Sequence, residues 1–136
     1  MKDKKFEFLE HTADLKFRVY GSTINEIFEN TVLAISIYIS PDKKIASKKG
    51  KVIEAHGKDH ESLFYNFIDE ILFLIDSEGF VPAKAEVTMM GYNLKAELYG
   101  DSAKNYEIKQ IKAATYAEMY IKKTRSGFEA QAVLDV

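Results

Sequence analysis

The stretch FLEHTADLKFRV, from Phe8 to Val19, decides how the fold begins. Apolar and charged residues alternate up to Leu9 and again from Leu15 onward, and this period of two is typical of strands that bury one face. The two runs therefore predict a pair of strands joined by a turn. The interruption between them gathers four polar side chains, those of Glu10, His11, Thr12 and Asp14.

This polar interruption has two interpretations. Threonine and aspartate side chains hydrogen-bond to nearby backbone groups, so they are common in turns that do nothing but connect strands. The same residues also supply oxygen ligands for a hard cation and groups for acid–base chemistry. On these residues alone, both interpretations stay open.

The length and composition predict a single compact domain over residues 1–136. The chain has 136 residues and is 46% hydrophobic, which is enough apolar material for a core. It has 19 basic and 21 acidic residues, so the formal net charge of −2 provides no overall basic field for nucleic acid or a membrane. Any contact with RNA should therefore be indirect or local. The absence of cysteine excludes disulfides and thiol catalysis, and the absence of an apolar leader predicts a cytoplasmic protein.

Two helices follow from the hydrophobic periodicity. Thr23 and Glu26 fit a capping box at the start of an amphipathic run that stops at Pro41. Asp59 can cap a second and stronger run, whose apolar residues recur at intervals of three and four until Glu78 and Gly79.

The remaining segments read mainly as strands. A short strand is predicted over 51–57, and two hairpins are predicted over 84–100 and 114–136. The segment 100–113 between the hairpins is mixed and is expected to be a loop with one short strand. The element order predicts an α+β fold in which both helices pack on one side of a single, mainly antiparallel sheet.

Common catalytic motifs are missing from the sequence. There is no glycine-rich phosphate loop, nucleophile elbow, HExxH or dinucleotide fingerprint. The familiar enzyme classes that depend on these motifs therefore lose support, and the chemistry has to be sought in the polar residues at the two ends of the chain.

The closing run EAQAVLDV places Asp135 beside the last residue of the sequence. Alternation should bury Ala132 and Leu134 on one face, or Val133 on the other, and leave Asp135 at the rim. Asp135 then lies next to the α-carboxylate of Val136 if Val136 ends the chain. Two carboxylates this close repel each other unless a proton or a cation lies between them. If the last strand pairs beside the first, Asp14 joins them, and three oxygen donors would favour Ca²⁺ or Mg²⁺ over zinc.

Several segments together carry a family resemblance. They are FLEHTADLKFRVYGSTINEIFENTVLAI near the start, LFYNFIDEILFLIDSEGFV in the middle, and IKAATYAEMYI and VLDV near the end. In this order and at this spacing, the chain resembles the archease family over nearly its whole length, with an archease-like fold expected. EHTAD and the final LDV are the most specific of these segments.

The resemblance implies a function that composition and motifs do not supply. Archeases are accessory proteins of the tRNA-splicing RNA ligase, which takes GMP from GTP onto an active-site histidine before it joins RNA ends. The resemblance implies that this chain promotes that guanylylation and multiple turnover without performing the ligation, so it is not expected to be an enzyme. It also implies a bound divalent cation, commonly Ca²⁺, held by acidic residues.

The family motifs map onto individual positions of this sequence. The metal-binding acids correspond to Asp14 and Asp135, to which the residue-based argument adds Val136. Four further residues match the motifs and are expected to orient a ligand or to contact the partner: Glu10, His11, Lys112 and Tyr116. Many archeases carry a histidine directly after this tyrosine, whereas this chain has Ala117.

Two other functions compete with the ligase activator. A general chaperone or specificity modulator of RNA-modifying enzymes would bind several unrelated enzymes. An independent metal-dependent hydrolase would need a base beside the cation, which only Glu10 and His11 could supply, and would turn over substrate alone.

Overall fold

The structure, a computed structural model, describes residues 4–136. Its elements, in chain order, are β1 (Phe6–Leu9), β2 (Asp14–Gly21), α1 (Ile24–Ile39), β3 (Lys49–His56), α2 (His60–Glu78), β4 (Phe80–Met90), β5 (Asn93–Ser102), the short 3-10 helix η1 (Ala103–Asn105), β6 (Ala113–Ala114), β7 (Tyr120–Thr124) and β8 (Gly127–Asp135). The predicted α+β class is confirmed, and both helices and the first hairpin lie where the pattern places them. The last hairpin is shorter than predicted, because its first strand begins at Tyr120 and residues 115–119 form a loop.

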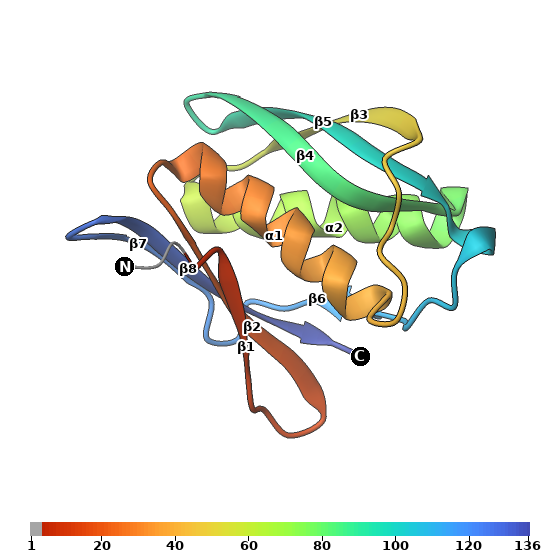
Figure 1. Ribbon diagram of the computed structural model, residues 1–136. Coiled ribbons are helices and arrows are strands. Elements are labelled where there is room, and N and C mark those ends of the chain that lie inside the picture. Colours follow the sequence, from red (N-terminus) through yellow and green to blue (C-terminus); the bar gives the residue numbers. More distant parts are fainter. Residues whose placement is uncertain (1–3) are drawn as a thin grey trace.

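The strands form two separate sheets, so the prediction of a single sheet is wrong. One sheet has the order β1-β2-β8-β6 with β7 also paired to β8, and the other has the order β3-β5-β4. All pairs are antiparallel. The helices lie between the sheets as the middle of three layers (Figure 1). They are therefore covered on two sides, and not packed on one side of one sheet.

Helix α1 shows why two sheets are needed. Its buried residues include Ile27, Asn30 and Ala34 on one face, and also Phe28, Val32 and Ser36 on another face of the helix. A helix that is buried over so much of its circumference needs a second covering layer. Alternation within a strand reveals that one face is buried, but it does not reveal which sheet the strand joins.

The N-terminus of α1 is capped in a slightly different way from the predicted capping box. The Thr23 side chain accepts a hydrogen bond from the backbone N–H of Glu26 at 3.2 Å, as expected. The Glu26 carboxylate, however, accepts from the N–H of Ser22 at 2.8 Å and not from that of Thr23. Helix α2 has a complete box, in which Asp59 and Ser62 exchange side-chain to backbone hydrogen bonds.

The two helices meet through aromatic side chains. Phe28 of α1 is fully buried, and its ring lies edge-on to those of Phe64 and Phe67 of α2, at centroid distances of 5.6 and 5.2 Å. Such edge-to-face pairs stabilise a core beyond the simple burial of area. This cluster fixes the spacing between the helices and therefore between the two sheets that cover them.

Strand β4 begins earlier than the sequence predicts. It starts at Phe80 because a bulge between Pro82 and Lys84 lets the chain pass a residue that has no backbone donor. Gly100 of β5 faces this bulge, and a Cβ atom there would collide with the carbonyl oxygen of Val81. Glycine at this position therefore permits the close approach of the two backbones.

The five-stranded sheet has β2 and β8 side by side near its centre. Their register places Asp14 opposite Asp135 and Leu15 opposite Leu134. Leu15, Phe17 and Val19 face the helices and are buried, as the alternation predicts. The polar residues of β2 therefore face outward on the far side of this sheet. No helix within residues 4–136 is both long and apolar enough to cross a lipid bilayer.

Candidate functional site

The polar interruption of the sequence forms the turn between β1 and β2 at one end of the five-stranded sheet. Ala13, just before the first residue of β2, has a φ of 65°, in the left-handed region that non-glycine residues seldom occupy. The turn ends by delivering Asp14 to the start of β2, where the strand meets the last residue of β8.

Asp14 and Asp135 lie directly opposite each other across the β2–β8 pair. Directly opposed residues project from the same face of a sheet, with Cβ atoms about 5 Å apart. Their neighbours Leu15 and Leu134 are buried toward the helices, so the two carboxylates project from the outer face. The adjacency on which a shared cation depended is therefore present in the fold.

The backbone of Asp135 is held from both sides. On one side it pairs with β2, and on the other it pairs with Ala113 of β6. The N–H of Lys112 donates a hydrogen bond to the carbonyl oxygen of Asp135 at 2.7 Å. Lys112 thus contributes its backbone to this site, whereas its side chain is exposed. Val136 follows with its side chain packed against the core.

His11 bridges Asp14 and an acid that the sequence did not reveal. Its Nε2 atom lies 3.1 Å from Oε2 of Glu118, and its Nδ1 atom lies 3.5 Å from Oδ2 of Asp14. The second distance is too long for a good hydrogen bond. Among the described residues, the buried Nδ1 atom has no hydrogen-bond partner, although a carboxylate stands directly beside it.

Glu118 is the residue that sequence reasoning missed. It lies in the loop between β6 and β7, and its carboxylate also accepts a hydrogen bond from Lys16 of β2 at 2.8 Å. The hydrogen bonds from Lys16 and His11 hold the pKa of Glu118 below its usual range. The only signal in the sequence is an acid that breaks the apolar pattern in TYAEMY, and nothing local connects it with His11.

The loop that carries Glu118 is fastened to the outer face of the sheet. The Thr115 hydroxyl donates to the carbonyl oxygen of Val133 at 2.8 Å, and the Gln131 amide donates to the carbonyl oxygen of Glu118 at 2.8 Å. Val133 points outward by alternation yet is 1% exposed. The loop therefore covers the middle of the sheet and leaves the acidic end open.

Tyr116 and Glu10, the remaining predicted residues, stand at the edge of this arrangement. The ring of Tyr116 stacks on that of Tyr65 from α2, with a centroid distance of 4.2 Å and an interplanar angle of 7°, and it remains 55% exposed. Glu10 is exposed in the β1–β2 turn. Both are available to a partner, and neither has a recorded contact with Asp14 or Asp135.

The donor set fits a hard cation only in part. Two carboxylates project from one face, and carboxylate oxygens are the ligands that Ca²⁺ and Mg²⁺ prefer. Within residues 4–136, however, no three histidine or acidic side chains are arranged to hold a metal ion together. A cation here would need further oxygen ligands, such as water, the α-carboxylate of Val136 or groups of a partner.

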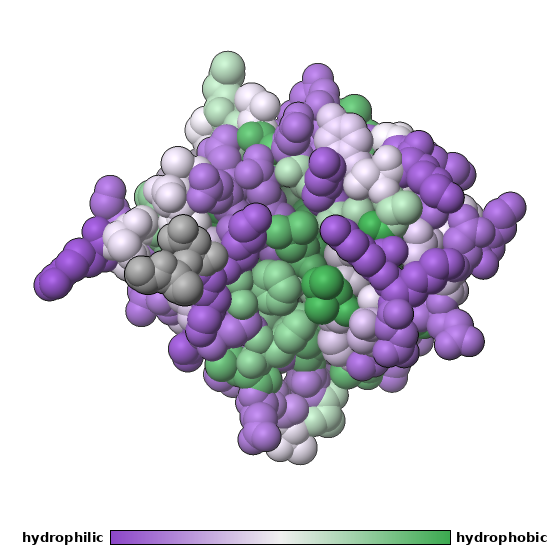
Figure 2. All heavy atoms as spheres, viewed as in Figure 1, coloured by the Kyte–Doolittle hydropathy of each residue, from purple (hydrophilic) through white to green (hydrophobic). Residues whose placement is uncertain are grey.

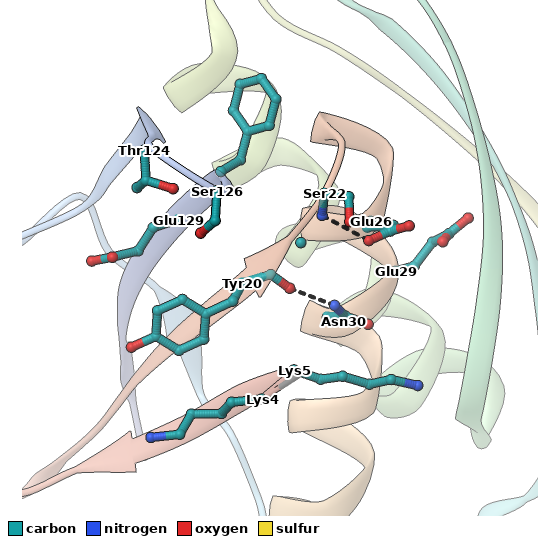
Figure 3. A pocket seen from close by; sticks show the side chains of 12 residues that line it. Lys4, Lys5, Tyr20, Ser22, Glu26, Glu29, Asn30, Thr124, Ser126 and Glu129 are labelled. Carbon is teal, nitrogen blue, oxygen red and sulfur yellow. Dashed lines mark hydrogen bonds between the residues drawn. The ribbon is translucent and has the colours of Figure 1, made fainter. Parts of the chain in front are cut away.

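A groove lies on the surface at the opposite end of β2. It is an open groove of about 1100 Å³ between β2, the start of α1 and the β7–β8 turn. Lys4 and Lys5 extend in opposite directions along it, while Glu26 and Glu29 project from α1 (Figure 3). Its charged groups do not converge on one point, so the groove does not compete with the acidic end as a candidate site.

The fold and the site define a class before any comparison is made. This is a small α+β protein whose chemistry-bearing residues stand on an exposed sheet end. The model of the Archease protein family (MTH1598/TM1083) matches residues 6–136. The chain belongs to the archease family.

Relatives from distant organisms support this assignment. The archease of Pyrococcus abyssi is 40% identical over 98% of this chain and 99% of its own length. An archease-like protein of Drosophila melanogaster is 32% identical over 98% of this chain and 92% of its own.

Two solved structures share the fold. The solution structure of protein 1598 of Methanobacterium thermoautotrophicum matches with a TM-score of 0.79 and 27% identity, covering 96% of this chain and 98% of that one. The crystal structure of an archease from Thermotoga maritima matches with a TM-score of 0.67 and 21% identity, covering 94% of both chains. At that identity the second match establishes the fold alone.

Proposed function

We propose that this chain is a non-catalytic cofactor of a cytoplasmic tRNA-splicing RNA ligase, which it activates by promoting guanylylation of the ligase's histidine and multiple turnover. The observation that carries the proposal is the direct pairing of Asp14 with Asp135 on an open sheet end. Such a pair of acids costs folding free energy unless a proton or a cation lies between the carboxylates, because like charges directly opposite each other destabilise a sheet.

Asp14, Asp135 and Val136 would hold the divalent cation, Ca²⁺ or Mg²⁺. When bound, the cation supplies positive charge that can neutralise the phosphates of GTP or fix a ligase conformation competent for histidine attack. The protein's own part is positioning. Lys112 holds the backbone of Asp135 on one side. The exposed Tyr116 and Glu10 stand where the ligase could contact the chain. This chain itself would not contact the RNA directly.

His11 and Glu118 would tune this site. In the structure the His11 ring stands between Asp14 and Glu118, and Lys16 anchors Glu118. A ring held in this way by Glu118 stands beside the Asp14 carboxylate and limits where that side chain can turn. The contact between His11 and Glu118 also ties the loop that carries Tyr116 to the β1–β2 turn.

The test measures GTP-dependent guanylylation of the cognate ligase with the wild-type chain and with an Asp14→Ala, Asp135→Ala double variant. Stimulation by the wild type that is lost in the variant supports the proposal, provided that circular dichroism shows the variant folded. Asp69→Ala, which removes an exposed acid from α2, is the matched control and should stimulate normally. Failure of the wild type to stimulate an active ligase with added Ca²⁺ or Mg²⁺ would overturn the proposal.

A general chaperone is the second candidate. The Thermotoga maritima relative is described as a possible chaperone. In this chain, Phe8 and Ile37 are 42% and 45% exposed, and exposed apolar surface is what a chaperone would use to hold a client. Binding of several unrelated RNA-modifying enzymes with comparable affinity would favour this candidate, whereas binding of the ligase alone would favour the activator.

A further inference from the structure

Strand β1 differs from the two edges of the three-stranded sheet in how its backbone is guarded. It is one terminal strand of the five-stranded sheet, whose other border is formed by β6 and β7. The edge of β4 is covered at Val87, where the Asn25 and Glu29 side chains of α1 bond the backbone carbonyl and N–H. The edge of β3 carries exposed lysines, including Lys49, which discourage strand addition. β1 instead presents alternating phenylalanines.

The hydrogen-bond register shows which backbone groups of β1 face outward. The N–H of Tyr20 bonds the carbonyl oxygen of Lys5 at 2.9 Å, so Lys5 and Tyr20 form a hydrogen-bonded pair. Hydrogen-bonded and non-hydrogen-bonded pairs alternate along an antiparallel ladder. The backbone N–H and C=O groups of Glu7 and Leu9 therefore also point toward β2. The N–H and C=O groups of Phe6 and Phe8 therefore point away from β2, toward the open edge.

These outward groups restrict how a second copy of β1 could pair antiparallel with the first. Both partners must contribute outward-facing residues, so Phe6 can face Phe6 or Phe8 of another copy but not Glu7. The register that uses the whole edge sets Phe6 against Phe8, and it then sets Lys4 against Glu10 of the other copy. Because the pairing is two-fold symmetric, each of these contacts occurs twice.

The side chains complement each other in this register. Lys4 and Glu10 are both exposed and of opposite charge, so both ends of the paired strands would carry a favourable ion pair. The phenylalanines would lie side by side on the face toward α1. There the rings of Phe6 and Phe8 already pack edge-on, with their centroids 5.5 Å apart, and the ring centroid of Phe8 lies 6.4 Å from that of Tyr38.

An apolar surface continues from this edge onto α1. Phe8 and Ile37 are 42% and 45% exposed. A hydrophobic patch is visible on the face where α1 and β1 lie (Figure 2). Pairing of two β1 strands would cover part of it in both copies. One feature opposes the pairing, since Glu7 would face its own copy across the two-fold axis. Its carboxylate, however, already accepts a hydrogen bond from Tyr20. Lys4, which bonds Glu7 in the single copy, would exchange that contact for Glu10 of the other copy.

From this self-complementarity we infer that two copies of this chain associate through antiparallel pairing of their β1 strands, joining two five-stranded sheets into one. The edge is short, so the association is weak, with a dissociation constant on the order of 10 to 100 µM. It leaves the acidic site of each copy free, because Asp14 and Asp135 lie on β2 and β8.

Sedimentation velocity of the complete chain over a range of concentrations tests the inference. The wild type should shift from monomer to a discrete dimer. Lys4→Glu and Glu10→Lys should each raise the dissociation constant by at least about tenfold, since each turns both symmetric ion pairs into repulsions. The double variant Lys4→Glu, Glu10→Lys restores opposite charges and should recover the dimer. Circular dichroism checks that each variant is folded.

Lys95→Glu, a charge reversal on the exposed face of β5, is the matched control and should leave the dissociation constant unchanged. A chain that stays monomeric at hundreds of micromolar would overturn the inference. An extended segment of another protein would then be the candidate to pair with the β1 edge. The inference would also be overturned if neither single charge reversal weakened the dimer, or if the folded double variant failed to dimerise. The same holds if Lys95→Glu weakened the dimer as much as the single reversals do.

Discussion

Replacing Asp14 with asparagine should stabilise the protein without a divalent cation and destabilise it, relative to the wild type, once the cation is added. The change removes one of two carboxylates that face each other across β2 and β8 and keeps the side-chain shape. In the metal-free protein this relieves a like-charge repulsion. In the metal-bound protein it removes a ligand.

The two effects differ in size. At the Cβ separation of about 5 Å, two carboxylates repel by roughly 0.8 kcal/mol in water and more where solvent is partly excluded. Lys16 and His11 nearby offset part of this, so about 1 kcal/mol is the relief expected. A cation present at 100 times its dissociation constant stabilises the wild type by about 2.7 kcal/mol. For a domain of this size the corresponding shifts in melting temperature are about 3 °C and 8 °C.

Thermal unfolding followed by circular dichroism, in EDTA and in a Ca²⁺ titration, measures both effects. The wild-type and Asp14→Asn curves should cross as Ca²⁺ rises, with the variant melting higher in EDTA and lower at saturation. Asp69→Asn on α2 should follow the wild type under both conditions. A variant that gains as much from Ca²⁺ as the wild type would refute the reasoning, because Asp14 would then contribute nothing to cation binding.

Three further predictions concern the fold around the site. Phe28→Ala should lower the free energy of unfolding by about 3 to 5 kcal/mol in urea denaturation, whereas Phe73→Ala, at a position 56% exposed, should change it by less than about 0.5 kcal/mol. Burial and a hydrogen bond to a glutamate raise the pKa of Tyr20 and of Tyr120 to about 12, above the ordinary 10.0. The folded state therefore keeps protons that the unfolded state loses, so stability should fall between pH 10 and pH 12, and replacing both tyrosines by phenylalanine should flatten that fall in alkaline melts. The pKa of Glu118 is lowered from 4.5, so the stability it contributes is present above that value and disappears as the pH falls below it; Glu118→Gln should weaken this acid dependence and speed hydrogen exchange in residues 115–119.

The local elements could be predicted from the sequence because each depends on nearby residues. Asp59 caps α2 as expected, and Gly91, with a φ of 62°, sits in the turn of the β4–β5 hairpin. The position of Asp135 at the exposed rim of the last strand is likewise as expected, although alternation left open whether Leu134 or Val133 faces the core. In each case the physical cause lies within a few positions along the chain.

The partition into two sheets and the role of Glu118 could not be predicted in this way. Whether β3 joins β5 or a strand of the other sheet depends on packing around the helices, to which alternation is blind. Glu118 meets His11 across 107 positions of sequence, and no periodicity connects them. The proximity of Asp14 and Asp135 was expected only if the last strand paired beside the strands at the start of the chain. The register of β2 and β8 shows that it does.

The β2–β8 pair also sets the order of events in folding. Its residues are distant in the chain, since Arg18 and Gln131 are bonded across 113 positions. Closing so long a loop costs chain entropy before the contacts between the strands provide stabilising free energy. Contacts of this kind therefore form slowly and late. On the ribosome, β2 cannot pair with β8 until β8 has emerged, whereas α2 and the β4–β5 hairpin can form earlier. The acidic end of the sheet therefore cannot exist on a nascent or truncated chain, and its assembly reports that synthesis has reached β8.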